Sequence, residues 1–265
     1  MKLLSGPVIT VIVILGALIG LTVYSGMFPP VSVVESGSMQ HSPDWEFGVI
    51  NTGDIVVVKK ISSPVNDVTT YVQGRTSNFS TYGDYGNVIL YHDMHGLVII
   101  HRAMFYLSWT SGHPVVQGYA NQSWITVTNT YILLKDVGFT HRNLIVLLSG
   151  MQNESGYITM GDHNLAISNV KVGNLSAYIA ADENVNIMAH PVTQTEVIGV
   201  AQGQIPWLGL VKLNIMRLQG DWPYYNDVPY HSYDYLAVTL AIIAVAVFFP
   251  YDRVLDSKKK KNNKK

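Results

Sequence analysis

The 265-residue chain contains no cysteine. Disulfide bonds, a thiol nucleophile and a cysteine-ligated zinc site are therefore excluded, and an exported domain of this composition must be held together by its hydrophobic core and sheet pairing. Charged residues are also scarce, at 13% of the chain, and two long runs near its ends carry none. These two uncharged runs are the first features that need an interpretation.

The first uncharged run covers residues 7–28. At about 1.5 Å per residue a helix of this length crosses a hydrocarbon core of about 30 Å. A cleaved secretory signal is the alternative, but the run exceeds the usual apolar core of about 7 to 15 residues of such signals and leads into Pro29-Pro30 without a small-x-small site. We therefore predict a cytoplasmic start and an N-terminal transmembrane anchor over 1–28.

A second uncharged run covers residues 235–251, at the short end of the range for a membrane span, and we predict a second transmembrane helix there. The tail 252–265 contains six lysines, which favour a cytoplasmic location over a nucleic-acid patch. The segment 29–234 has nine basic and 16 acidic residues, a net charge of −7. We expect an integral cell-membrane protein with both termini cytoplasmic and 29–234 extracytoplasmic. Four Asn-x-Ser sequons give weak support to the extracytoplasmic location of this segment. They lie at Asn78, Asn121, Asn153 and Asn174.

Between the two runs the pattern predicts a mostly β domain. Short apolar stretches alternate with clusters of Gly, Asn, Asp and Ser, and no helical period of similar strength is present. The stretches lie at Ile55–Val58, Val88–Tyr91, Leu97–Ile100, Trp124–Val127 and Tyr157–Met160. We expect antiparallel sheets, with irregular insertions at 62–84 and 164–192.

Chemistry-bearing residues occur in a fixed order along this domain. Ser36-Gly37-Ser38-Met39 follows the first apolar run by about ten residues and would alone indicate a turn. His101 ends the apolar stretch Leu97–Ile100, and Asp162 follows Gly161 after another such stretch. One further block, Gly53–Val58, lies between Ser38 and His101, and another, Val197–Gly209, follows Asp162.

Together these blocks resemble the type I signal peptidases, in particular the archaeal and endoplasmic-reticulum branch, in which His replaces the Lys of the bacterial enzymes. The resemblance extends from the first apolar run to Gly209 and leaves the intervening loops unmatched. It implies a signal peptidase-like fold of antiparallel sheets, with Ser38 as nucleophile, His101 as general base and Asp162 as the acid near the base. It also implies Ser36 and the backbone amide of Ser38 as oxyanion donors.

These residue types suit acyl transfer. A serine hydroxyl is a weak nucleophile until a neighbouring imidazole takes its proton, and a carboxylate on the second ring nitrogen fixes the imidazole tautomer. Donors aimed at the tetrahedral oxyanion contribute roughly 3 to 4 kcal/mol each.

Two departures from the family pattern matter. The family has Pro two residues after the Met, whereas Gln40-His41-Ser42 precede Pro43 here, so the loop after the nucleophile is longer. Relatives also carry a second Asp about six residues after the Gly-Asp pair, where this chain has Ser168. Asp162 is the preferred acid because of its position in the block. Asp182 is the alternative, if an insertion has displaced the second acid.

Other residues are less suitable as catalytic groups or metal ligands. His141 begins an apolar stretch and lacks the relative position of His101, and the adjacent Lys59-Lys60 pair is typical of a solvated strand edge rather than a catalytic lysine. His92 and His95 are three residues apart but have no third ligand nearby, so we predict a hairpin turn and no metal. No cofactor is expected.

The sequence therefore predicts a membrane-bound serine endopeptidase that removes signal peptides from exported preproteins after small residues. Its expected partners are preprotein signal peptides, the lipid bilayer and the secretion translocon, and no nucleic acid. Two alternatives stay open: a non-catalytic signal peptidase-like binding or assembly protein, and a protease for other membrane-proximal substrates.

Overall fold

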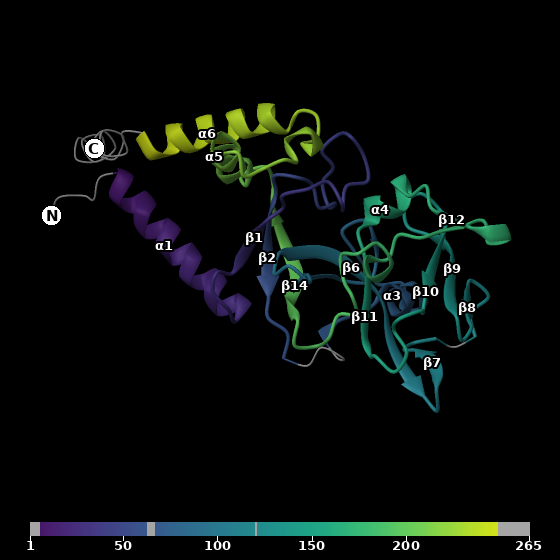
Figure 1. Cartoon of the computed structure of the whole chain (residues 1–265). Coiled ribbons are helices and arrows are strands. Elements are labelled where there is room, and N and C mark those ends of the chain that lie inside the picture. Colours follow the sequence, from purple (N-terminus) through teal and green to yellow (C-terminus); the bar gives the residue numbers. More distant parts are fainter. Residues whose placement is uncertain (1–5, 63–66, 120, 249–265) are drawn as a thin grey trace, which may run out of the picture.

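The computed structural model describes residues 6–62, 67–119 and 121–248. The start of the chain, the final residues of the expected second span and the tail 252–265 lie outside these ranges. The first helix, α1 (Gly6–Ser25), projects from the rest of the molecule (Figure 1). Most of its apolar side chains are uncovered, with Val13 63% and Ile19 65% exposed, and residues 8–25 are long and apolar enough to cross a membrane. The expectation of an N-terminal apolar helix is confirmed.

The rest of the structure is mostly antiparallel β, as expected. A seven-stranded sheet lies next to α1 and has the order β1-β2-β14-β5-β6-β11, with β7 also paired to β6, and all its pairs are antiparallel. Its strands are β1 (Val31–Val33), β2 (Ile55–Lys59), β5 (Val88–His92), β6 (Val98–Thr110), β7 (His113–Val116), β11 (Gly156–Met160) and β14 (Val197–Ile205).

A five-stranded sheet lies beyond β6 and β11 and has the order β12-β13-β10-β9-β8, in which only β10 and β13 pair in parallel. Its strands are β8 (Ile125–Val127), β9 (Tyr131–Val137), β10 (Arg142–Leu147), β12 (Lys171–Val172) and β13 (Ala177–Tyr178). A small hairpin pairs β3 (Ser80–Thr81) with β4 (Asp84–Tyr85).

The long strand β6 connects the two sheets. Its first half pairs with β5, and its second half pairs with β11 and β7. The side chains of Met104, Phe105 and Leu107 on β6 are buried in the largest hydrophobic cluster, together with residues of the five-stranded sheet such as Ile132 and Val146. Because β6 pairs with strands on both of its sides, it holds residues such as His101 in a fixed position.

Two segments that we expected to be irregular contain regular structure. Residues 62–84 include helix α3 (Tyr71–Ser77), whose Thr70 and Gln73 form a reciprocal capping box, a signal that the sequence Thr-x-x-Gln does contain. Residues 164–192 include most of helix α4 (Asp162–Ile167), the strands β12 and β13, and the 3-10 turns η1 (Gly173–Leu175) and η2 (Asp182–Asn184). The expectation of insertions without secondary structure is wrong for both segments.

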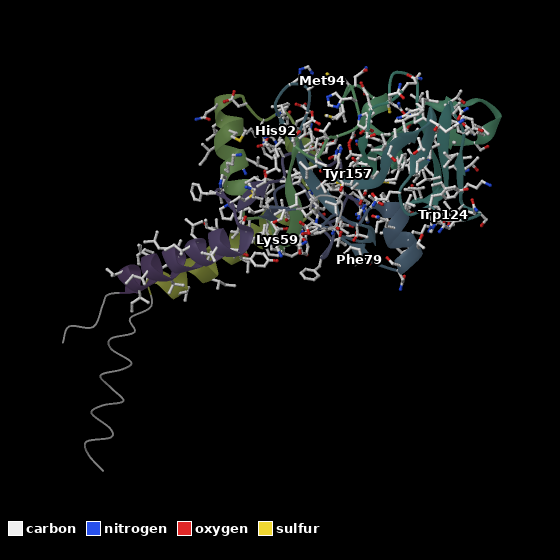
Figure 2. All side chains as sticks on the ribbon, turned by 90° about the horizontal axis from the view of Figure 1, so that it is seen from below. Lys59, Phe79, His92, Met94, Trp124 and Tyr157 are labelled. Carbon is white, nitrogen blue, oxygen red and sulfur yellow. The ribbon has the colours of Figure 1, made fainter. Side chains whose placement is uncertain are left out.

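Up to residue 248, where the described part of the chain ends, three helical elements follow β14: α5 (Leu210–Gln219), the turn η3 (Tyr225–Asp227) and α6 (Ser232–Phe248). The described part of α6 has 17 residues, about 25 Å at 1.5 Å per residue, and is shorter than a typical span. The two apolar helices, α1 and α6, contact each other and extend away from the β domain (Figures 1 and 2). Only α1 meets the length of a membrane span within the described residues.

Candidate active site

Ser38 lies in the loop between β1 and β2, which at Gly37 and Ser38 is held by one hydrogen bond to a backbone group and one to a side chain of other segments. Met39, next in the chain, is 1% exposed and anchors the loop in the core. The Ser38 carbonyl oxygen accepts a hydrogen bond from the His163 backbone N–H at 2.9 Å, and the Gly37 N–H donates to Asp227 Oδ2 at 3.1 Å. Ser38 itself is only partly buried, so its hydroxyl lies on a fixed but accessible backbone.

His101 lies on β6 opposite Ile89 of β5 and is 3% exposed. Its Nδ1 is 2.7 Å from Asp182 Oδ2. A carboxylate accepts hydrogen bonds, so this contact places the ring proton on Nδ1 and leaves Nε2 as an acceptor. His101 thus has the tautomer that a general base requires.

Gly161 shows how close His101 comes to the Ser38 loop. A methyl group placed on Gly161 would lie 2.8 Å from His101 Nε2 and 2.6 Å from the Ser38 carbonyl oxygen. Both atoms therefore surround one small space, which a side chain would fill. The acceptor nitrogen of His101 and the Ser38 loop are neighbours because position 161 has no Cβ.

The Ser38 hydroxyl has a different contact. Among the described residues, Ser36 Oγ donates to Ser38 Oγ at 3.5 Å, and no hydrogen bond joins Ser38 to His101. In acyl-transfer sites in general, contacts between a serine and its general base are often long before substrate binds and shorten in the reacting complex. Within the described residues the Ser38 N–H has no hydrogen-bond acceptor, so it is free to donate to a substrate oxygen, as the resemblance predicts.

Asp182 is held on turn η2 in a fully buried network. Its Oδ2 also accepts a hydrogen bond from the Tyr91 hydroxyl at 2.6 Å, and the Thr159 hydroxyl donates to Tyr91 at 3.0 Å. Burial and the nearby Asp182 charge raise the pKa of Tyr91 well above its ordinary value, so this hydroxyl stays protonated. The network fixes Asp182 against His101.

The second buried carboxylate at the site, Asp162, has other partners. Arg102 Nε lies 2.8 Å from Asp162 Oδ1 and Arg102 Nη2 lies 2.6 Å from Oδ2, while His41 Nε2 lies 3.0 Å from Oδ2. Burial alone would raise the pKa of Asp162, but the Arg102 guanidinium and the His41 ring lower it to about 2. The preferred expectation, that Asp162 meets His101, differs from the structure. The carboxylate on His101 is Asp182, which was the alternative.

The physical reason is the buried guanidinium. Arg102 is 0% exposed, and successive side chains on a strand point to opposite faces, so Arg102 points away from its neighbour His101. A buried guanidinium requires a paired carboxylate, and Asp162 supplies it in a two-point contact. Arg102 also donates to backbone carbonyl groups of residues 81–86. Asp162 thereby ties the start of α4, and through His163 the Ser38 loop, to β6.

The remaining candidates lie away from Ser38 and His101. His141 is exposed and contacts Asp136, Lys59 lies over the Tyr24 ring near the end of α1 (Figure 2), and the His92 ring faces the Gly96 carbonyl in the β5–β6 turn. Within the described residues, no group of three metal-ligating side chains is present.

No protein-family model matches the chain, and no curated protein is similar to it in sequence. The residues of the site therefore carry the functional argument by themselves.

The Arg102–Asp162 pair gives a testable stability effect. Asp162→Asn leaves the buried guanidinium without its counter-charge and is expected to lower the free energy of unfolding by about 3 to 5 kcal/mol near neutral pH. Because folding lowers the pKa of Asp162 from 3.8 to about 2, its stabilisation is present above about pH 4 and is lost as the pH falls through 2.

Urea unfolding of the full chain in detergent, followed by tryptophan fluorescence from pH 7 to pH 2, measures this effect. The difference in the free energy of unfolding between the wild type and Asp162→Asn should become smaller below about pH 4. Asp136→Asn is the matched control, because Asp136 is exposed and pairs with Arg75 at the surface, and it should cost less than about 1 kcal/mol. An equal cost for both variants would contradict the account of the buried pair.

Proposed function

We propose that this chain is a membrane-anchored serine endopeptidase that cleaves signal peptides from exported preproteins after small residues. The observation that carries the proposal is the buried His101–Asp182 contact at 2.7 Å, with the free His101 Nε2 next to the Ser38 loop. A buried carboxylate, an imidazole of fixed tautomer and a serine on an anchored loop are the parts of an acyl-transfer site.

The chemistry follows from these positions. Ser38 Oγ attacks the scissile carbonyl carbon while His101 Nε2 takes its proton, and Asp182 stabilises the imidazolium that forms. The oxyanion accepts hydrogen bonds from the Ser38 N–H and the Ser36 hydroxyl. When the tetrahedral intermediate breaks down, His101 gives the proton to the leaving amine, and water then releases the acyl group by the same steps in reverse order.

Membrane attachment supports the choice of substrate. Ser38 follows the apolar run 7–28 by ten residues, so it can lie no further than about 35 Å from the end of that run. A signal peptide that is inserted in the bilayer presents its cleavage site at this distance. In the proposed topology α1 and a second helix over 235–251 both span the membrane, the termini are cytoplasmic and the domain 29–234 is extracytoplasmic.

Cleavage of a defined preprotein tests the proposal. The full chain is reconstituted in lipid vesicles with a preprotein that has Ala at the expected cleavage position, and with the same preprotein carrying Trp there. We expect a single cut after Ala, located by mass spectrometry of both fragments, and at least a hundredfold slower cutting of the Trp form, because a shallow pocket excludes a bulky side chain. No cutting of either form, or equal cutting of both, would overturn the proposal.

A further inference from the structure

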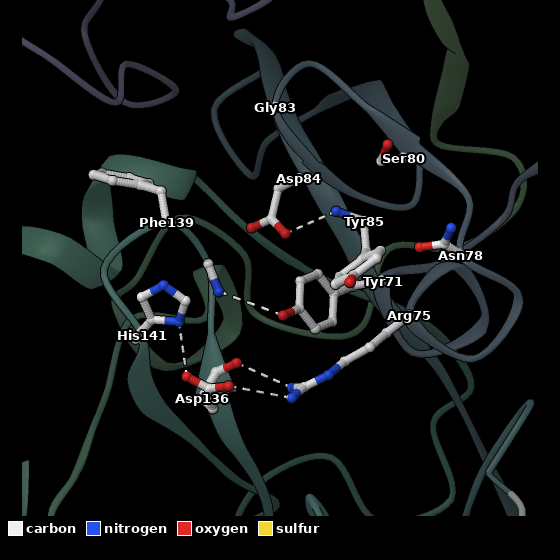
Figure 3. A pocket seen from close by; sticks show the side chains of 11 residues that line it. Tyr71, Arg75, Asn78, Ser80, Gly83, Asp84, Tyr85, Asp136, Phe139 and His141 are labelled. Atoms are coloured by element: carbon white, nitrogen blue, oxygen red, sulfur yellow. Dashed lines mark hydrogen bonds and ion pairs between the residues drawn. The ribbon is translucent and has the colours of Figure 1, made fainter.

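A cavity of about 490 Å³ lies between α3, the β3–β4 hairpin and the β9–β10 turn (Figure 3). Aromatic rings line it: Tyr71 is 1% exposed, and Tyr85 and Phe139 are partly buried. The cavity adjoins the His41–Asp162 contact, because Phe139 stacks on the His41 ring with a distance of 4.2 Å between ring centroids, and His41 Nε2 lies 3.0 Å from Asp162 Oδ2.

The charged groups near the outer part of this cavity already neutralise one another. Asp136 Oδ1 lies 2.8 Å from His141 Nδ1, and Asp136 Oδ2 lies 3.5 Å from Arg75 Nη2 (Figure 3). Arg75 also donates to the Lys135 and Asp136 carbonyl oxygens and lies over the Trp124 ring. Asp136 and Arg75 are thus paired with each other.

Asp84 is different, because it lines the cavity without a counter-charge of its own. Within the described residues its carboxylate has no ion pair, and it accepts a hydrogen bond from the adjacent Tyr85 N–H at 2.7 Å through Oδ1. Its Oδ2 faces Gly138, another lining residue. The nearest buried cation, Arg102, is paired with Asp162. Burial raises the pKa of Asp84, and the Asp162 charge adds to this rise. The charges of Arg102 and His41 and the Tyr85 N–H act in the opposite direction but do not cancel it, so the ionised form is only partly compensated.

We propose that this cavity binds a primary ammonium or guanidinium group. Asp84 Oδ2 would accept charge-assisted hydrogen bonds from the cation, and the rings of Tyr71, Tyr85 and Phe139 would cover its alkyl stem and attract its charge. The same chemistry is presented by a Lys or Arg side chain of a bound polypeptide and by a free alkylamine. If the ligand is a substrate side chain, the inference rests on the proposed function.

Binding can be measured without catalysis by using the full chain with Ser38→Ala in detergent micelles. Calorimetric titration with n-pentylammonium should give saturable binding, and titration with 1-pentanol, which has the same stem without the charge, should give none. The comparison of these two probes requires no substitution in the cavity. Equal binding of the two probes, or no binding of pentylammonium, would overturn the proposal.

A second pair of variants locates the site. Asp84→Asn keeps an acceptor for the Tyr85 N–H and should weaken pentylammonium binding about tenfold or more, because a charge-assisted hydrogen bond is lost. Asp221→Asn removes the same charge from an exposed position after α5 and should leave the affinity unchanged. Unchanged affinity in Asp84→Asn would show that the cation binds elsewhere and would overturn the assignment.

Competition identifies the source of the cation. An N-acetylated hexapeptide with one Lys should displace pentylammonium, and the same N-acetylated peptide with norleucine should not, if the ligand is a polypeptide side chain. Binding of the free amine alone would assign the pocket to small amines. Either result supports a cation site, and neither depends on cleavage, so failure of the endopeptidase proposal would be seen separately.

Discussion

Replacing Ser38 by Ala is expected to lower kcat for preprotein cleavage by about 10⁶-fold, and His101→Ala should cost about as much. The two groups act as a unit, because the imidazole has nothing to deprotonate without the hydroxyl and the hydroxyl is a weak nucleophile without the imidazole. The double variant should therefore be no slower than either single variant.

Initial rates of fragment release in lipid vesicles measure these effects. Ser42→Ala is the matched control, since Ser42 lies in the same loop and its hydroxyl accepts a hydrogen bond from the Asp44 N–H instead of facing the site. The initial rate of Ser42→Ala should lie within a few fold of the wild-type rate. Substantial cleavage by Ser38→Ala, or additive losses in the double variant, would show that Ser38 and His101 do not form one catalytic unit.

Asp182→Asn is expected to lower kcat by about 10⁴-fold with little change in KM. The Asn amide can donate to His101 Nδ1, which would move the ring proton to Nε2 and remove the acceptor that faces the Ser38 loop. Because Asp182 and Asp162 are both buried, the change in activity must be separated from loss of folded protein.

A comparison with Asp162→Asn separates the loss of activity from the loss of folded protein. Rates are expressed per mole of folded enzyme, with the folded fraction taken from near-UV circular dichroism. Asp162→Asn should reduce stability strongly and kcat less than Asp182→Asn, because its carboxylate contacts Arg102 and His41 rather than His101. A larger loss of kcat in Asp162→Asn would instead favour the assignment preferred from the sequence.

Much of the β structure could be predicted because it rests on apolar stretches that alternate with turn residues. All five predicted stretches overlap strands of the structure, from β2 to β11. The elements that were not predicted include β9 with seven residues and α5 with ten, as well as shorter ones. β12 and β13 have two residues each and are stabilised by pairing with β10, so no local periodicity reveals them. Sequence patterns cannot show pairing between segments far apart in the chain.

The order of the sequence blocks selects Ser38 and His101 as candidates but does not decide between the two acids. Ser38, His101 and Asp162 come from blocks with recognisable order, whereas Asp182 lies on a 3-10 turn in a segment we expected to be a loop. Arg102, which follows His101 directly, explains why Asp162 is not the partner of His101. A buried Arg next to the base competes for the nearest acid, and Asp162 satisfies it. The contribution of His41 could not be foreseen, because it lies in the lengthened loop after the nucleophile.

The second membrane span and the cytoplasmic tail remain predictions. The described part of α6 is apolar but short, and residues 249–265, which include the six lysines, lie outside the described ranges. Accessibility of single cysteines introduced into this cysteine-free chain would establish the topology directly.

Covalent trapping tests the central claim most directly. The full chain is treated with a peptidyl phosphonate that ends in Ala, and the modified residue is identified by mass spectrometry. We predict one adduct, on Ser38, which forms in the wild type and Asp136→Asn but at least a thousandfold more slowly in His101→Ala and Asp182→Asn. An adduct on another residue, or labelling of Ser38 at the wild-type rate in His101→Ala, would contradict the account.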